Sequence, residues 1–279
     1  IVLIILGDVF QVPVGDLFAA AIWPGLTLVA AYIIFILIVS YFKKDMAPAI
    51  PKDPARGSKM KQILNAIIAI VPSLTLILMV LGSIFAGVAT PTESSAVGCL
   101  GAVLLAIAYK SFSIQMIKEA SFESVKVTSM VFAILIGATA FSMVFTYTGG
   151  DEIVETFMKN LPGDEKFAFI LFTMLAIFLL GFFIDFVEIS YIIVPILVPI
   201  AMNLDINPVW FAILIAMNLQ TSFLTPPFGF ALFYLKGVVS SNIRTIDIYK
   251  GVLPFILIQI IVLLLLVFFP DFFGIKASL

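Results

Sequence analysis

The chain has 279 residues, of which 62% are hydrophobic and 11% are charged. Soluble domains of this length are roughly a quarter charged, and no soluble core could enclose this much apolar surface, so the composition indicates a membrane protein. The net charge of −2 gives no basis for nucleic-acid binding, and the absence of histidine excludes histidine metal sites, Ser-His-Asp catalysis and histidine proton relays.

Residues 1–42 contain two apolar stretches. The chain opens on the apolar run Ile1–Leu6, with no initiator methionine or charged segment before it, which does not fit a signal peptide. We expect this run to be the end of a helix whose beginning is missing, so that the sequence is a fragment. The run Leu17–Phe42 exceeds the roughly 20 residues that a membrane-spanning helix needs.

A basic linker and three predicted spans come next along the chain. Residues 43–61 form the linker, and the spans are 62–85, 94–109 and 127–148. Ser111–Val125 mixes charged and apolar residues, a composition typical of a segment that lies along the membrane interface.

The sequence Thr90-Pro91-Thr92-Glu93 predicts the start of a helix. Thr90 as N-cap, Pro91 at the first helical position and Glu93 at the third form a capping box. We interpret this motif as mainly structural, and a direct functional role is the less favoured alternative.

Lysine and arginine collect in alternate connections. Cytoplasmic loops of membrane proteins carry the excess of these residues, which predicts that 43–61 is cytoplasmic and that the acidic connection 151–166 is on the outer face. Three connections hold 12 of the 15 basic residues, which are Lys43, Lys44, Lys52, Arg56, Lys59, Lys61, Lys110, Lys118, Lys126, Lys236, Arg244 and Lys250.

Residues 167–204 are two short apolar arms around Asp185 and Glu188. The arms are either two short spans joined by an acidic turn or a re-entrant hairpin that turns back inside the bilayer. We favour the hairpin, because the tip has no basic residue and an acid at membrane depth needs a cation or a partner nearby. Residues that interrupt helices also lie in the arms, namely Gly181, Pro195 and Pro199.

Residues 207–238 predict a broken helix, and a final span is expected at 251–270. The uncharged run 206–235 would be ~45 Å long as one helix, against a hydrocarbon core of ~30 Å. Pro226 and Pro227 remove two backbone donors, and Thr225 before them is pushed out of helical geometry. The alternative is a simple proline kink in which serine and threonine bond back to their own helix.

An opened helix at this position has a chemical use. Open backbone is tolerated in a bilayer only where protein buries it or where it lines a cavity. Freed carbonyl oxygens together with threonine and serine hydroxyls suit Na⁺, and the N-termini of half-helices favour an anionic substrate.

Three motifs resemble the large membrane subunit of the tripartite ATP-independent periplasmic (TRAP) transporters of bacteria and archaea. They are Gly87–Gly98 (GVATPTESSAVG), Gly181–Pro199 (GFFIDFVEISYIIVPILVP) and Asn207–Gly237 (NPVWFAILIAMNLQTSFLTPPFGFALFYLKG), of which the last is the most specific. The resemblance covers essentially the whole chain.

The resemblance implies an all-α polytopic membrane protein with the elevator-type fold of the ion transporter superfamily. That fold has two inverted repeats, each with one re-entrant hairpin and one broken helix. Residues 1–42 would be the end of the first repeat and the following span, 62–279 the second repeat, and most of the first repeat would be missing. The implied partners are a small four-span membrane subunit, a periplasmic substrate-binding protein and the lipid of the cytoplasmic (inner) membrane.

The resemblance also implies a Na⁺ site between the hairpin tip and the break. We expect Na⁺ to be the coupling ion, with no other cofactor, and its candidate ligands are Gly181, Thr221, Thr225 and Pro226. The full set of residues expected to bind substrate or ion is Gly181, Asp185, Asn218, Gln220, Thr221, Ser222, Thr225, Pro226, Pro227 and Gly229.

The function expected is Na⁺-coupled uptake of small carboxylates, such as C4-dicarboxylates, 2-oxo acids, and sialic or aromatic acids. A periplasmic binding protein would deliver the substrate, and the protein would not be an enzyme. One alternative is a divalent-anion:sodium symporter that needs no binding protein. A non-transporting scaffold or an intramembrane enzyme is another, although Asp185 and Glu188 are a poor catalytic pair because they lie three residues apart on one segment.

Overall fold

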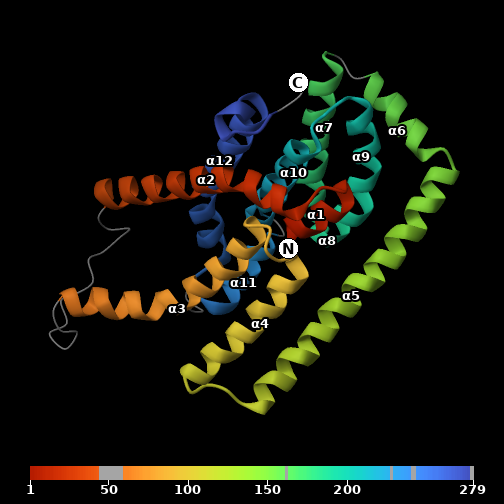
Figure 1. Ribbon diagram of the computed structural model, residues 1–279. Coiled ribbons are helices and arrows are strands. Elements are labelled where there is room, and N and C mark those ends of the chain that lie inside the picture. Colours follow the sequence, from red (N-terminus) through yellow and green to blue (C-terminus); the bar gives the residue numbers. More distant parts are fainter. Residues whose placement is uncertain (44–58, 161–162, 227–228, 240–242, 277–279) are drawn as a thin grey trace. The chain divides into compact units, whose positions relative to one another are not determined.

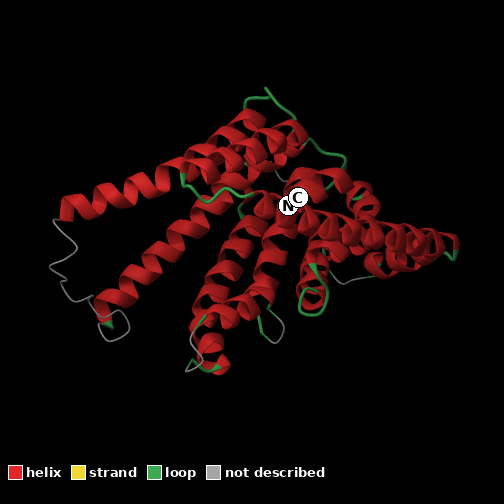
Figure 2. Cartoon of the chain, turned by 90° about the horizontal axis from the view of Figure 1, so that it is seen from below, coloured by secondary structure: helices red, strands yellow, loops and turns green. Residues whose placement is uncertain are grey.

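The computed structural model describes residues 1–43, 59–160, 163–226, 229–239 and 243–276 (Figure 1). All regular structure in these residues is helical, as Figure 2 shows by colour. The elements are α1 (Val2–Phe10), α2 (Val14–Phe42), α3 (Lys59–Phe85), α4 (Pro91–Ala108), α5 (Ile114–Tyr147), α6 (Gly150–Lys159), α7 (Glu165–Leu180), α8 (Phe186–Glu188), a π-helical turn (Ile189–Ile193), α9 (Val194–Asn203), α10 (Pro208–Leu224), α11 (Phe230–Val238), α12 (Thr245–Phe268) and a 3₁₀ turn (Pro270–Phe273).

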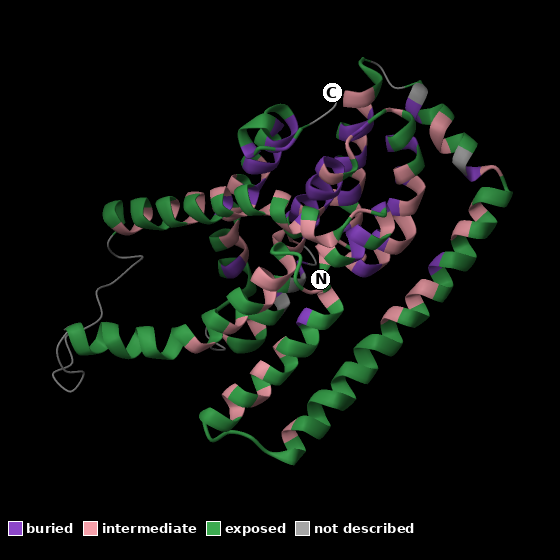
Figure 3. Cartoon of the chain, viewed as in Figure 1, coloured by how far each residue is buried: buried purple, intermediate pink, exposed green. Residues whose placement is uncertain are grey.

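Six helical stretches in the described residues are long and apolar enough to cross a membrane. Their large apolar side chains are widely exposed, as the green faces of α2, α3 and α5 show in Figure 3. Leu37 on α2 is 63% exposed and Ile136 on α5 is 71% exposed. Soluble proteins rarely expose apolar patches of this extent, so lipid is the natural solvent for these faces. The chain is an all-α, multi-pass membrane protein.

The chain divides into two compact units, Ile1–Ile36 with Ser129–Leu279, and Leu37–Thr128. The second unit is built around the antiparallel pair α3 and α4. Glycine on α4 makes room for a side chain of α3, because a Cβ added to Gly101 would lie 2.3 Å from Leu76 Cδ1. A hydrogen bond of 2.8 Å between the Ser83 and Ser94 hydroxyls also joins the pair.

Helix α10 is the core of the first unit. It packs against α1, α7 and α12, and eleven of its 17 residues are buried. Trp210 is fully buried, and its indole Nε1 donates a hydrogen bond of 3.0 Å to the Leu266 carbonyl on α12. A helix that is apolar on all sides is typical of a fully enclosed position, and this one holds the residues of the break at its C-terminal end.

Helix α5 is longer than the span predicted within it. We expected a span at 127–148 and an interfacial location for Ser111–Val125, and one helix runs without interruption over Ile114–Tyr147. Side-chain pairs along the helix support its polar first half. Lys126 Nζ lies 2.5 Å from Glu123 Oε1, and Gln115 Nε2 donates to Glu119 Oε1 over 2.7 Å.

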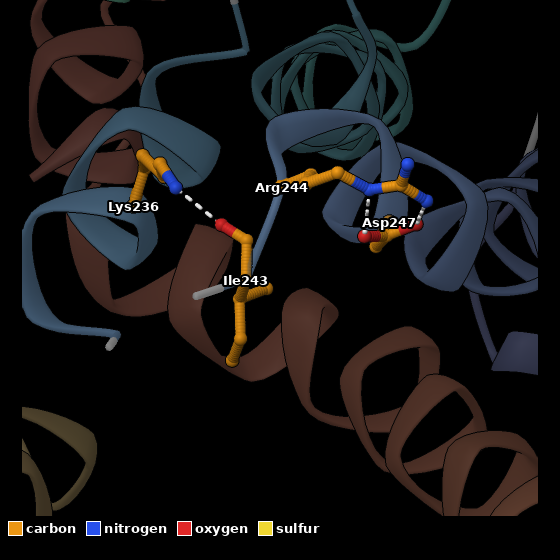
Figure 4. Close-up of polar contacts among 4 residues, drawn as sticks. All are labelled: Lys236, Ile243, Arg244 and Asp247. Atoms are coloured by element: carbon orange, nitrogen blue, oxygen red, sulfur yellow. Dashed lines mark hydrogen bonds and ion pairs between the residues drawn. The ribbon is translucent and has the colours of Figure 1, made fainter. Parts of the chain in front are cut away.

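The last helix begins earlier than predicted. The span expected at 251–270 is α12, which begins at Thr245. Figure 4 shows the contacts that order this start: Arg244 Nε and Nη2 donate to the Asp247 carboxylate over 2.9 and 3.1 Å, and Lys236 Nζ donates to the Ile243 carbonyl. Polar side chains therefore extend the helix beyond its apolar run.

Candidate functional site

The hairpin tip, residues 181–185, joins α7 to the arm formed by α8, the π-helical turn and α9. Helix α7 ends at Leu180, and the second arm begins at Phe186. Asp185 and Glu188 form a capping box at the start of this arm, in which Glu188 Oε2 accepts from the Asp185 amide over 2.9 Å. Both acids are therefore engaged locally. Whether the hairpin is re-entrant remains a prediction.

Helix α10 breaks where the two prolines predict it. It ends at Leu224, Thr225 is extended (φ −93°, ψ 126°), and α11 begins at Phe230. Of the two prolines, Pro226 lies in the turn, and Pro227 lies outside the described residues. The backbone is therefore not continuously helical from α10 to α11, and a simple kink does not describe it.

The break leaves carbonyl oxygens without their regular helical donors. Because Pro226 has no N–H, the Ser222 carbonyl instead accepts from the Thr225 amide over 3.0 Å. In a regular helix the amide of residue 227 would donate to the Phe223 carbonyl, but residue 227 is also a proline and has no N–H. A Cβ added to Gly229 would lie 2.7 Å from the Phe223 oxygen and 3.1 Å from the Thr225 oxygen. Two carbonyl oxygens thus lie close to this glycine, which has room for them only because it lacks a side chain, and the Thr225 oxygen accepts a hydrogen bond of 3.1 Å from the Gly229 amide.

The hydroxyls near the break bond back to their own helix. Thr221 Oγ1 donates to the Met217 carbonyl over 2.9 Å, Ser222 Oγ to Leu219 over 2.8 Å, and Thr225 Oγ1 to Thr221 over 2.8 Å. This is the bonding that we predicted for a kinked helix, and it occurs together with a full break. A hydroxyl that donates once keeps two acceptor lone pairs, so each oxygen retains the capacity to bind a cation.

The hairpin tip contacts the end of α10. A Cβ added to Gly181 would lie 2.2 Å from Ser222 Oγ. One turn earlier on α10, the buried Asn218 Nδ2 donates a hydrogen bond of 2.6 Å to the Met174 carbonyl on α7. We call these two contacts the α7–α10 seam. They place Gly181 against Ser222 and tie Asn218 to α7 through the Met174 carbonyl, which no sequence motif indicated.

Gln220 faces a different part of the unit from Ser222. Two residues on a helix are about 200° apart around its axis, and Gln220 lines a mostly apolar cavity of about 360 Å³ with residues of α1 and α2, among them Leu3 and Pro24. Gln220 and Ser222 therefore face different parts of the unit, and a role for Gln220 in binding substrate or ion stays a prediction.

The motif at the start of α4 is the capping box that the sequence predicts. Thr90 Oγ1 accepts from the Glu93 amide over 3.3 Å, Glu93 Oε2 accepts from the Thr90 amide over 2.8 Å, and Pro91 is the first helical residue. These contacts satisfy backbone donors that the helix itself leaves free.

Replacing Thr90 by Val should remove the side-chain cap and destabilise the second unit by about 1 kcal/mol. We expect a lower thermal unfolding midpoint, with the uptake that the sequence predicts retained when the assay is run well below that midpoint. Thr90→Ser, which keeps the hydroxyl, is the matched control. Loss of uptake in a folded Thr90→Val protein would contradict the structural reading and favour a transport role.

Comparison with known proteins shows which family the sequence matches. Residues 1–272 match the family described as tripartite ATP-independent periplasmic transporter, DctM component. The chain is 31% identical over 273 residues to the sialic acid TRAP transporter large permease protein SiaM of Vibrio cholerae, which covers 97% of the chain and 61% of that protein.

Two further relatives cover similar shares. The C4-dicarboxylate TRAP transporter large permease protein DctM of Pseudomonas aeruginosa is 28% identical over 271 residues, 97% of the chain and 61% of that protein. The 2,3-diketo-L-gulonate TRAP transporter large permease protein YiaN of Escherichia coli is 25% identical over 269 residues, 96% of the chain and 61% of that protein. The chain thus spans about three fifths of the length of these relatives. It belongs to the DctM component family of the tripartite ATP-independent periplasmic transporters.

Proposed function

We propose that this chain belongs to the large permease subunit of a Na⁺-coupled transporter for small organic anions. The observation that carries the proposal is the break between α10 and α11. The end of α10 that precedes the break contacts the hairpin tip, where Ser222 lies against Gly181. The relatives support the substrate class, because their names specify sialic acid, C4-dicarboxylate and 2,3-diketo-L-gulonate.

The chemistry of the break suits both a cation and an anion. Carbonyl oxygens near Gly229 and the lone pairs of the Thr221 and Thr225 hydroxyls are hard ligands for Na⁺, with the backbone at Gly181 and Pro226 completing the proposed site. The N-terminus of α11 directs partial positive charge toward the break, where a substrate carboxylate is favoured. Sodium bound first would strengthen this attraction.

Coupling supplies the energy for uptake. When more positive than negative charge enters, each net charge gains ~2.3 kcal/mol per 100 mV of membrane potential. We propose an elevator-type movement of the hairpin and broken helix in the cytoplasmic membrane, with a small four-span subunit and a periplasmic binding protein as partners. The protein would catalyse no chemical reaction.

Replacing Thr225-Pro226-Pro227 by Leu-Ala-Leu in the full-length protein should close the break and abolish Na⁺-dependent uptake. The substitutions restore two backbone donors and remove one hydroxyl, so a continuous helix becomes favourable. The measurement is uptake of labelled carboxylates into proteoliposomes that contain the small subunit, with the binding protein outside.

Pro72→Leu is the matched control, because Pro72 lies inside the unbroken helix α3. We expect this variant to transport like the wild type. Wild-type uptake by the triple variant would remove the break from the mechanism. Uptake by the wild type with the binding protein omitted would favour the symporter that works without one.

A further inference from the structure

A cavity of about 500 Å³ with a mixed polar and apolar lining lies in the first unit, away from the break. Its walls come from α1, from the last third of α5, and from the second hairpin arm. We call it the hydroxyl cavity, because five of its six polar lining side chains carry hydroxyls: Thr139, Ser142, Thr146, Tyr147 and Tyr191, with the carboxylate of Asp8 as the sixth.

Asp8 is held in place at the end of α1. Gln11 closes this helix in a left-handed conformation (φ 53°, ψ 39°), and its side-chain Nε2 donates to the Asp8 backbone carbonyl over 2.5 Å. Helix α1 itself packs against α10 and the second hairpin arm. The Asp8 side chain remains exposed, so its carboxylate is accessible to a ligand in the cavity.

The charged residues on α1 and on the second hairpin arm are all acidic. The hairpin arm that contributes Tyr191 also carries Asp185 and Glu188, and neither α1 nor residues 181–203 contain lysine or arginine. On α5 the nearest basic residue is Lys126, 13 positions before Thr139 and therefore ~20 Å away along the helix. The lining attracts cations and opposes an unaccompanied carboxylate.

The lining groups also decide the kind of cation. Carboxylate and hydroxyl oxygens are hard ligands that suit alkali and alkaline-earth ions. One carboxylate is too little charge to strip water from a divalent ion, and a space of this size has room for an ion that keeps much of its hydration shell. A monovalent, partly hydrated ion fits these conditions.

We propose that the hydroxyl cavity binds Na⁺ through Asp8 and the neighbouring hydroxyls, as a site separate from the break. None of its lining residues belongs to the hairpin tip or to the break. The assignment of Na⁺ over other monovalent ions rests on the proposed transport function, while the presence of a cation site rests on the cavity alone.

The test is Asp8→Asn in the full-length protein, with two readouts. The first is the thermal unfolding midpoint in a series that exchanges choline for Na⁺ at constant ionic strength. The second is the Na⁺ concentration for half-maximal uptake in proteoliposomes. We expect the Na⁺-dependent stabilisation to shrink and the half-maximal concentration to rise about tenfold, the loss for one charged ligand. Ser142→Ala should shift both readouts in the same direction by less.

Asp16→Asn is the matched control, because Asp16 is also an exposed acid near the N-terminus and does not line the cavity. An unchanged Na⁺ response in Asp8→Asn, or an equal change in Asp16→Asn, would overturn the proposal. A raised substrate KM with an unchanged Na⁺ response would also overturn it, by assigning the cavity to the substrate. If wild-type uptake needs no Na⁺, the proposed function fails, and the thermal series with Na⁺, K⁺ and Li⁺ still decides whether the cavity binds a cation.

Discussion

Gly181→Ala is expected to abolish Na⁺-dependent uptake by the full-length protein. The added Cβ would lie 2.2 Å from Ser222 Oγ and 2.7 Å from Ser222 Cβ, distances that real Cβ atoms essentially never show. Rotation of the serine hydroxyl relieves the first clash but not the second, because Ser222 Cβ is fixed to the backbone of α10. The hairpin tip must therefore move away from the end of α10, which separates the proposed Na⁺ ligands.

A second substitution separates space from chemistry. Ser222→Gly removes both clashing atoms, so the double variant Gly181→Ala/Ser222→Gly should recover the thermal stability that Gly181→Ala loses. We expect its uptake to stay low, because the Ser222 hydroxyl is absent. Gly137→Ala on α5 is the control, since its added Cβ meets no atom within 4 Å. Wild-type uptake by Gly181→Ala itself would show that transport does not need the close contact at the tip.

The glycine illustrates what sequence could and could not predict. We interpreted Gly181 as an interruption of the helix, yet its conformation is right-handed (φ −64°, ψ −6°) and open to any residue. It is required because Ser222, 41 positions later, occupies the space of a side chain. No local pattern encodes such a contact, because it arises only when α7 packs on α10.

Features with local causes were predictable. Two adjacent prolines cannot continue a helix, so the break after Leu224 follows from the sequence, and the capping box at Thr90 is a four-residue pattern. We did not predict that α5 is continuous, because the polar residues of Ser111–Val125 were interpreted as lying before the start of the span. The spacing of Glu123 and Lys126 nevertheless favours a helix. Residues 44–58 of the predicted linker lie outside the described residues, so the linker stays a prediction.

Asn218→Asp should be the most destabilising single change at the α7–α10 seam. The Asn218 side chain is 1% exposed, and its Nδ2 donates to the Met174 carbonyl over 2.6 Å. An ionised aspartate offers no donor and would place a carboxylate oxygen against a carbonyl oxygen inside the protein. The expected loss of stability is on the order of several kcal/mol, measured as a fall in folded protein and in the thermal unfolding midpoint.

Asn218→Leu tests whether the hydrogen bond from Asn218 to Met174 serves Na⁺ binding or only the stability of the core. Leucine has the same branched shape but larger terminal groups, and the Met174 carbonyl lies inside α7, where the helix supplies another donor, so about 1 kcal/mol of stability should be lost with the hydrogen bond and a similar amount to the tighter packing. The variant should fold. If the hydrogen bond holds the hairpin on α10 in the geometry that Na⁺ needs, the half-maximal Na⁺ concentration rises, while substrate KM at saturating Na⁺ stays near the wild-type value.

Gln259→Leu provides the contrast, because this amide on α12 is fully buried and neither of its polar atoms has a hydrogen-bond partner among the described residues. Burying an amide without a hydrogen bond costs free energy, and leucine removes that cost. This variant should therefore be as stable as the wild type or more stable. A rise in half-maximal Na⁺ concentration for Asn218→Leu alone would make the α7–α10 seam part of ion binding. An equal rise in both variants would mean that any loss of buried polarity loosens the core, and Asn218 would then have no special place in the mechanism.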